Sequence, residues 1–257
     1  FLRAGGIAPG MDTLVVGAGE MGRWFAGALA DGADTPVSLA FADTDPAVAE
    51  AAAERHGGRA VEGDTDERFD LVVVAVPIPA AEAVIERYAD RTTGAMVDLA
   101  GVMDGPLAAM RAAAPDCERA SLHPLFAADN APGTVAAVVD SGGPVLETVR
   151  AALTARGNTW AETTAEEHDR AMETVQAAAH TAVLAFGLAA ADVPDQFHTP
   201  VSAALFDVLS QVTGNDPRVY ADIQAAFDGA DAVAEAAARI ADADAEAFAD
   251  LYAEAGR

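Results

Sequence analysis

A glycine-rich turn directly after an apolar run is the feature that most restricts how this chain can fold. Gly17, Gly19 and Gly22 follow the run Leu14–Val16 in the pattern G-x-G-x-x-G. The first glycine permits a tight turn, the second a close approach of a pyrophosphate, and the third the packing of a helix against a strand. Because an apolar run precedes the pattern and a helical segment follows it, we predict a dinucleotide-binding βα unit.

The ends of two further apolar runs extend this candidate cofactor site. Asp43 follows the run Val37–Ala42, where a carboxylate accepts hydrogen bonds from the adenosine ribose and repels a 2′-phosphate, so NAD is favoured over NADP. A helix-capping role is the alternative for Asp43, and a glycine turn without a nucleotide is the alternative for the motif. The candidate cofactor-binding residues are Gly17, Ala18, Gly19, Glu20, Met21, Gly22, Asp43, Val76 and Pro77.

The spacing of apolar runs predicts an α/β half followed by an all-helical half. Buried strands are expected at Leu14–Val16, Val37–Ala42, Leu71–Val76, Met96–Leu99 and Val135–Val139. Continuous apolar strands separated by helical segments indicate a doubly wound parallel sheet covered on both faces. Helices are expected at 165–192, 199–213, 216–238 and 243–255. We therefore predict a Rossmann domain over 11–163 and a helical domain over 164–257.

Composition restricts the partners and the setting. The 257 residues carry 41 acidic against 15 basic side chains, a formal net charge of −26, and every basic residue is arginine. GC-rich coding accounts for part of the preference for arginine over lysine but not for the acid excess, which predicts a high-salt, halophile-like cytoplasm whose ions screen the charge. Nucleic acid and anionic membrane surfaces are disfavoured as partners. We also expect residues 1–10, which precede Met11, to lie outside the authentic start of the protein.

Several other classes of site and location are disfavoured as well. Cys117 is the only cysteine, so no internal disulfide forms. No set of histidines and carboxylates shows the spacing of metal ligands, so no metal is expected. No segment reaches the roughly 18–20 apolar residues of a membrane span, and no signal peptide is evident, which predicts a cytoplasmic protein.

The best catalytic candidate is His123, in the segment Ser121-Leu-His-Pro-Leu-Phe126, which is expected to follow directly after a strand. A single histidine is more often structural, and His56 and His198 are interpreted as surface or capping residues. Around these histidines the chain resembles the prephenate dehydrogenases and arogenate dehydrogenases of tyrosine biosynthesis. The resemblance covers residues 11–257 and rests on Val97–Met103, Leu122–Phe126, Glu167-His-Asp169 with His180, and Asp216–Ile223.

The resemblance implies a Rossmann domain joined to a helical dimerisation domain like that of the 6-phosphogluconate dehydrogenases, with the active site between them and a homodimer formed through the helical half. It implies NAD-dependent oxidative decarboxylation of prephenate to 4-hydroxyphenylpyruvate. His123 matches the histidine that accepts the hydrogen bond of the substrate 4-hydroxyl, a role suited to an imidazole that is neutral at working pH. His180 matches a substrate contact, and His168 an orienting or capping group about 18 Å away along one helix.

The chain departs from the family pattern at three places. Gly101-Val102-Met103 replaces Ser-Val-Lys, Gln211 stands where a substrate-anchoring arginine is usual, and Ala127 replaces a glycine. Glutamine cannot form the two charge-assisted hydrogen bonds that an arginine makes to a carboxylate. The substrate carboxylates would therefore have to be bound by Arg218, Arg170, a protonated His180 or helix dipoles. The candidate substrate-binding residues are His180, His168, Gln211, Arg218 and Gly101. Arogenate as substrate, a two-domain reductase of another small acid, and a non-catalytic dinucleotide sensor remain as alternatives.

Overall fold

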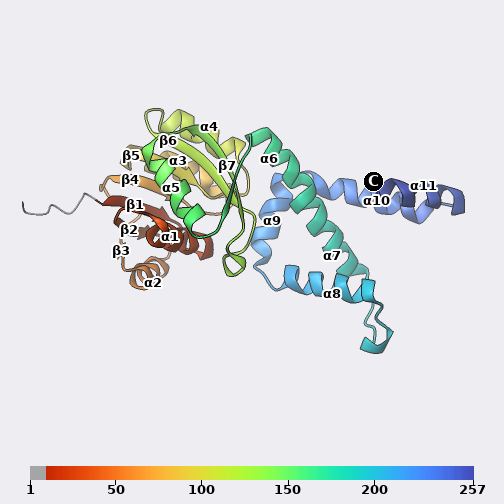
Figure 1. The fold of residues 1–257 in the computed structure, drawn as a ribbon. Coiled ribbons are helices and arrows are strands. Elements are labelled where there is room, and N and C mark those ends of the chain that lie inside the picture. Colours follow the sequence, from red (N-terminus) through yellow and green to blue (C-terminus); the bar gives the residue numbers. More distant parts are fainter. Residues whose placement is uncertain (1–9) are drawn as a thin grey trace, which may run out of the picture. The chain divides into compact units, whose positions relative to one another are not determined.

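The computed structural model describes residues 10–257, and its first half is organised around one eight-stranded sheet (Figure 1). The strand order is β3-β2-β1-β4-β5-β6-β7-β8. The strands are β1 (Met11–Val16), β2 (Val37–Ala42), β3 (Arg59–Ala60), β4 (Phe69–Val74), β5 (Thr92–Asp98), β6 (Glu118–Pro124), β7 (Thr134–Ser141) and β8 (Thr159–Glu162). The expectation for residues 1–10 falls almost wholly outside the described residues.

Most of the sheet is parallel, as predicted, but β7 runs antiparallel to β6. The reason is the length of the connection, because residues 125–133 are too few for the crossover that a parallel neighbour requires. The strand β6 was not among the predicted strands, and His123, which was expected to follow a strand, lies within it. The strands β3 and β8 were not predicted either. They are short edge segments, Arg59–Ala60 and Thr159–Glu162, and neither contains a continuous apolar run.

Helices cover both faces of the sheet. On one face α1 (Glu20–Gly32) packs against α2 (Pro46–His56) and α5 (Pro144–Ala155), and on the other α3 (Ala81–Tyr88) packs against α4 (Asp104–Ala113). Each face has its own apolar core, the first around Phe25 and Leu29, the second around Met96 and Leu107. Short 3-10 turns lie at Ile78–Ala80, Ala89–Arg91, Ala128–Asn130 and Asp195–Phe197. The two cores confirm a doubly covered sheet.

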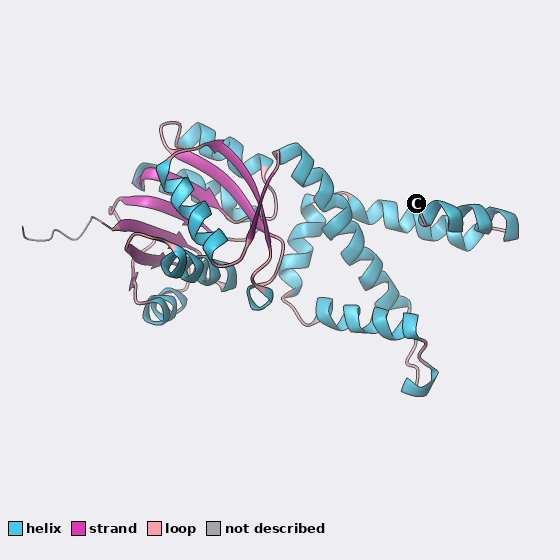
Figure 2. Ribbon diagram, in the orientation of Figure 1, coloured by secondary structure: helices cyan, strands magenta, loops and turns pink. Residues whose placement is uncertain are grey.

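The chain divides into two compact units, the first ending at His168 and the second running from Asp169 to Arg257. All described strands belong to the first unit (Figure 2). The helix α6 (Ala165–Met172) spans the boundary between the units. The helices after it are a π-helix (Glu173–Ala178), α7 (Ala179–Ala189), α8 (Pro200–Thr213), α9 (Pro217–Ala226), α10 (Gly229–Asp242) and α11 (Ala245–Ala255).

Two helices differ from the prediction. The segment 165–192 contains a π-helical stretch and ends at Ala189, so His168 and His180 are not separated by regular α-helix. The segment 216–238 is two helices, because the chain bends at Phe227, whose side chain is buried. The bend brings Gly229 against the π-helix, where an added Cβ would lie 2.3 Å from the carbonyl oxygen of Glu173. The close packing of Gly229 on the π-helix therefore divides the segment 216–238 into two helices, although its apolar pattern is that of one.

No helix in the described part of the chain is long and apolar enough to cross a membrane. Within residues 10–257, no cluster of His, Cys, Asp and Glu side chains could hold a metal ion.

Candidate active site

The glycine turn between β1 and α1 has the geometry of a dinucleotide cradle. Gly17 has a φ of +93°, and a Cβ there would lie 2.3 Å from the carbonyl oxygen of Ala75. A Cβ at Gly22 would lie 2.0 Å from the carbonyl oxygen of Gly17. A Cβ at Gly19 would meet no atom within 4 Å, so the space beside Gly19 is open. Gly19 is also the residue that precedes α1, where backbone N–H groups favour an anion.

Asp43 is bound to this turn. Its Oδ2 accepts a hydrogen bond from the backbone N–H of Ala18 at 2.8 Å, and its Oδ1 accepts one from Asp45 at 3.0 Å. The guanidinium of Arg23 donates to the carbonyl oxygen of Ala18 at 2.7 Å, so both sides of that residue are held. A carboxylate has further lone pairs, and Asp43 therefore both shapes the turn and retains acceptors for ribose hydroxyls.

Val76 and Pro77 also lie at the predicted edge. The side chain of Val76 comes within 3.0 Å of the position that a Cβ on Gly17 would take. Pro77 directly precedes the 3-10 turn Ile78–Ala80. The parallel strands β1, β4, β5 and β6 all end at this edge, which is where open α/β sheets bind ligands.

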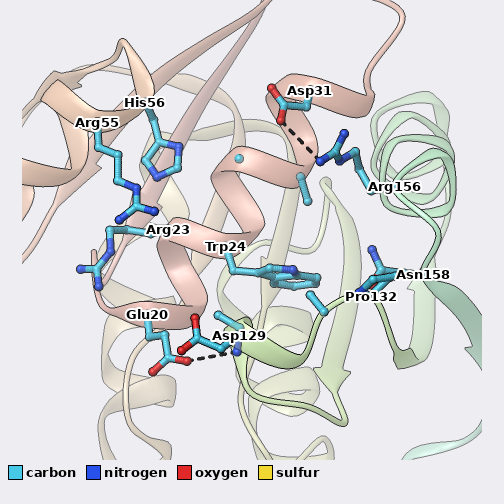
Figure 3. A pocket seen from close by; sticks show the side chains of 14 residues that line it. Glu20, Arg23, Trp24, Asp31, Arg55, His56, Asp129, Pro132, Arg156 and Asn158 are labelled. Atoms are coloured by element: carbon cyan, nitrogen blue, oxygen red, sulfur yellow. Dashed lines mark hydrogen bonds and ion pairs between the residues drawn. The ribbon is translucent and has the colours of Figure 1, made fainter.

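Glu20 faces a cavity of about 390 Å³ instead (Figure 3), and its carboxylate accepts a hydrogen bond from Ala128 N–H at 3.1 Å. The cavity lies among α1, the end of α2 and the loop 128–132, and neither His123 nor Asp43 lines it. Figure 3 shows Arg23, Arg55 and His56 at one side of it. Met21, the neighbour of Glu20, is half-buried. Of the cofactor candidates, Glu20 alone lines this cavity.

The centre of the catalytic candidate is a pair of histidines. Nδ1 of His123, on β6, lies 2.9 Å from Nε2 of His168, on α6. Their rings meet edge to face, with centroids 5.1 Å apart, and both side chains are buried. A hydrogen bond between two imidazoles fixes the tautomer and the orientation of each ring. His168 therefore contacts the catalytic candidate directly, which fits the predicted orienting role better than the capping role.

Gly101 and Met103 show what replaces the hydroxyl and the cation of the family pattern. A Cβ on Gly101 would lie 3.7 Å from Nε2 of His123 and 3.4 Å from Ile78, so this glycine borders the ring nitrogen that faces away from His168. Met103 is fully buried and packs in the core with Leu107. The position of the family lysine is therefore part of the hydrophobic core in this chain.

In the second unit, His180 pairs with Tyr220. Their rings lie edge to face with centroids 4.8 Å apart, and Nδ1 of His180 is buried without a hydrogen-bond partner among the described residues. Burial lowers the pKa of His180, because desolvation disfavours the charged imidazolium. His180 is therefore a poor substitute for the missing cation. Tyr220 also lines an apolar cavity of about 350 Å³ together with Leu184 and Pro217.

The remaining substrate candidates lie at exposed positions. Gln211 on α8 and Arg218 on α9 are both exposed, as is Arg170. Asn215 links the two helices, since its amide donates to the backbone carbonyl of Gln211 at 2.8 Å and to the hydroxyl of Tyr220 at 3.0 Å. Asn215 therefore connects the backbone of Gln211 to the hydroxyl of Tyr220, whose ring packs on His180, and Arg218 is exposed on the next helix.

Sequence reasoning missed Tyr220 and Asp98 as functional candidates, although both lie in segments that carry the resemblance. A tyrosine one helical turn from an Asp-Pro start was available as a signal for Tyr220. Asp98 ends β5 and is fully buried, which no linear pattern reveals.

The glycine turn with an acidic residue after the second strand, beside a buried histidine pair at the same sheet edge, defines a dinucleotide-dependent oxidoreductase. No family model matches the chain. It is 33% identical to the 4-amino-4-deoxyprephenate dehydrogenase of Streptomyces pristinaespiralis, over 97% of this chain and 91% of that protein. It is 31% identical to the T-protein of Enterobacter agglomerans, over 60% of this chain and 43% of that protein.

Solved structures show the same fold. The prephenate dehydrogenase of A. aeolicus, crystallised with hydroxyphenyl propionate and NAD+, superimposes with a TM-score of 0.70 at 15% identity, covering 88% of this chain and 86% of that one. The arogenate dehydrogenase of Synechocystis gives a TM-score of 0.63 at 16% identity, covering 96% and 98%. The chain belongs to the prephenate and arogenate dehydrogenase family of oxidoreductases.

Proposed function

We propose that the protein is an NAD-dependent prephenate dehydrogenase that oxidatively decarboxylates prephenate to 4-hydroxyphenylpyruvate in tyrosine biosynthesis. The observation that carries the proposal is the buried bond between His123 and His168, which leaves Nε2 of His123 facing Gly101. Residues 11–163 serve as the NAD-binding domain, and residues 164–257 as the substrate and dimerisation domain.

The histidine pair explains how a proton leaves the substrate. A neutral His123 that donates from Nδ1 to Nε2 of His168 keeps its own Nε2 unprotonated and able to accept the proton of the substrate 4-hydroxyl. The hydride of ring carbon C4 leaves with its electron pair, and the bond to the ring carboxylate breaks to release carbon dioxide. Its electron pair enters the ring, which becomes aromatic. Burial of the pair keeps water away from this step.

The residues of the glycine turn fit NAD. The open space at Gly19 and the N-terminus of α1 would hold the pyrophosphate, and Asp43 would hold the adenosine ribose. When bound, NAD accepts the hydride. The side chains Arg218, Gln211 and His180 would contact the substrate, with Arg218 as the cation that replaces the family arginine.

A second candidate substrate is 4-amino-4-deoxyprephenate, which the name of the Streptomyces relative specifies. The specific observation in its favour is the pair of positions Gly101 and Met103, which offer neither a hydroxyl nor a cation near Nε2 of His123. A substrate with an ammonium group at C4 would meet less repulsion there than beside a lysine. Initial rates of NADH formation with prephenate, arogenate and the 4-amino compound rank these substrates, and turnover of none would contradict the proposal.

Gly101→Ser is expected to raise kcat/KM for prephenate about threefold to tenfold, because the new hydroxyl lies beside Nε2 of His123 and adds one hydrogen bond to the C4 hydroxyl. Steady-state kinetics measure this change. Gly101→Ala is the matched control, since it adds the same Cβ without a hydroxyl. Equal behaviour of the two variants would show that C4 does not bind at this side of His123.

We further propose a homodimer formed through the helical unit. Among its described residues the buried apolar side chains are only Met172, Ala177, Ile223 and Phe227, whereas large apolar side chains are exposed. The most exposed include Leu188 at 90%, Tyr252 at 76% and Val201 at 71%. Apolar surface of this extent is typical of an interface, and a second copy of the chain is the partner that the same surface would cover.

The acidic composition supports work in a high-salt cytoplasm. With a net charge of −26, the compact chain repels itself unless ions screen it. In molar KCl we expect sedimentation as a dimer and a higher midpoint of thermal unfolding than in dilute buffer. Sedimentation velocity and calorimetry test both statements; a monomer in molar KCl contradicts the dimer, and a midpoint that falls with KCl contradicts the adaptation to salt.

A further inference from the structure

Asp98 is a buried carboxylate to which the proposed reaction gives no role. It ends β5, its side chain is 0% exposed, and its Oδ1 accepts a hydrogen bond from Ala100 N–H at 2.9 Å. Among the side chains that the structure describes, it is the only carboxylate classed as buried. A carboxylate removed from water is costly unless positive charge or hydrogen bonds compensate it. The histidine pair, once protonated, is one positive charge close enough along the sheet to interact with it.

The register of the sheet places Asp98 beside the histidine pair. Asp98 is the direct neighbour of Ser121 on β6, and His123 lies two residues further along that strand. Side chains alternate between the faces of a strand, and Ala120 and Leu122 lie in the core on the α1 face. Ser121 and His123 therefore lie on the opposite face, which is also the face of Met96 and hence of Asp98.

Asp98, Ser121, His123 and His168 form a row of polar side chains that is shielded from solvent. Ser121 and Asp98 are 0% exposed, His168 is 3% exposed and His123 is 8% exposed. A proton taken up by His123 creates a cation in this setting, where desolvation disfavours charge. A negative charge held on the same face of the neighbouring strand stabilises that cation, because Coulomb interactions are strong where water is excluded.

The other charged groups on the elements around the row are more exposed. The exposed ones are Glu82 on α3, Asp104 and Arg111 on α4, and Glu166, Glu167 and Arg170 on α6. The half-buried ones are Asp169 on α6, Glu118 and Arg119 on β6, and Asp140 on β7. Water screens the exposed groups, so they act weakly on His123. Arg119 and Asp140 pair with each other at 3.0 Å, so their opposite charges largely cancel, and Asp98 is the fully buried charged group beside the histidines.

We propose that Asp98 is a positioning residue for the base: its buried carboxylate stabilises the protonated form of the His123–His168 pair. The pair then takes the substrate proton as the hydride departs and returns it to the product oxygen after carbon dioxide has left. Asp98 itself neither gains nor loses a proton. This inference rests on the proposed role of His123 as the base.

Asp98→Asn tests the proposal, because the amide keeps an oxygen that accepts from Ala100 N–H but removes the charge. Imidazole NMR of the protein without substrate follows the titration of the pair, and its midpoint is expected to fall by about one pH unit. The rising limb of the pH profile of kcat/KM, which reports the loss of that proton, should move to lower pH with it, and kcat should fall tenfold or more. An unmoved midpoint overturns the proposal.

Asp140→Asn is the matched control, since Asp140 is a carboxylate of the same sheet that pairs with Arg111 and Arg119. Its midpoint should equal that of the wild type. If Asp98→Asn fails to fold, Asp98→Ser replaces it, since serine also removes the charge and keeps an acceptor for Ala100 N–H: a midpoint below that of the wild type supports Asp98, and an unmoved midpoint overturns the proposal. Because the titration needs no substrate, it separates this inference from the proposed function, which fails if no substrate is turned over.

Discussion

Replacing His123 with Asn is expected to lower kcat by about 10²- to 10⁴-fold, the range that a positioned general base contributes. The amide cannot take the proton of the substrate hydroxyl, and it cannot reproduce the bond from Nδ1 to His168 together with an acceptor at the Nε2 position. Steady-state kinetics at saturating NAD measure the loss. The dissociation constant for NAD should change by less than twofold, because the glycine turn is unaltered.

His198→Asn is the control for this variant, since His198 lies in the second unit beside Ser202 and Phe206. It should retain wild-type kcat. If His123→Asn keeps more than a tenth of the wild-type kcat while His198→Asn is unaffected, His123 is not the base.

Gly22→Ala is expected to lower the stability of the fold, whereas Gly19→Ala is expected to weaken NAD binding. At Gly22 the new methyl would lie 2.0 Å from the carbonyl oxygen of Gly17, so the helix and the turn must separate. Overpacking of this kind costs about 2–3 kcal/mol, and the midpoint of thermal unfolding should fall by about 5–10 °C. At Gly19 the methyl meets no atom within 4 Å, so stability is kept.

The open space at Gly19 is, however, the space that the pyrophosphate requires. Gly19→Ala should therefore weaken NAD binding at least tenfold, which is about 1.4 kcal/mol of binding free energy. Calorimetric unfolding and titration with NAD measure the two effects separately. Wild-type NAD affinity in Gly19→Ala would place the pyrophosphate elsewhere and remove the assignment of this turn as the cofactor site.

The dinucleotide half of the fold was predictable because its signals are local. The turn Gly17–Gly22 and the apolar runs that became β1, β2, β4, β5 and β7 each lie in a short stretch of chain. The antiparallel direction of β7 was not predicted, since it follows from the length of the 125–133 connection rather than from apolar pattern. The bend at Phe227 was missed because burial of a side chain against distant residues decided it.

The site was predictable only in part. The segment around His123 pointed to it as the candidate base, but the partner of its Nδ1 is His168, 45 residues later, and only the folded chain brings the two together. The burial of Asp98 and of Met103 likewise depends on the packing of whole elements. The burial of His180 corrects the suggestion that its protonated form compensates for the missing arginine, because burial lowers its pKa.

The most direct test of the central claim is to supply NAD and prephenate labelled in the ring carboxylate, and to measure NADH and labelled carbon dioxide in the same reaction. We predict that both form in a one-to-one ratio with 4-hydroxyphenylpyruvate and that both are lost together in His123→Asn. NAD binding without release of labelled carbon dioxide would contradict the assignment of this protein as a prephenate dehydrogenase.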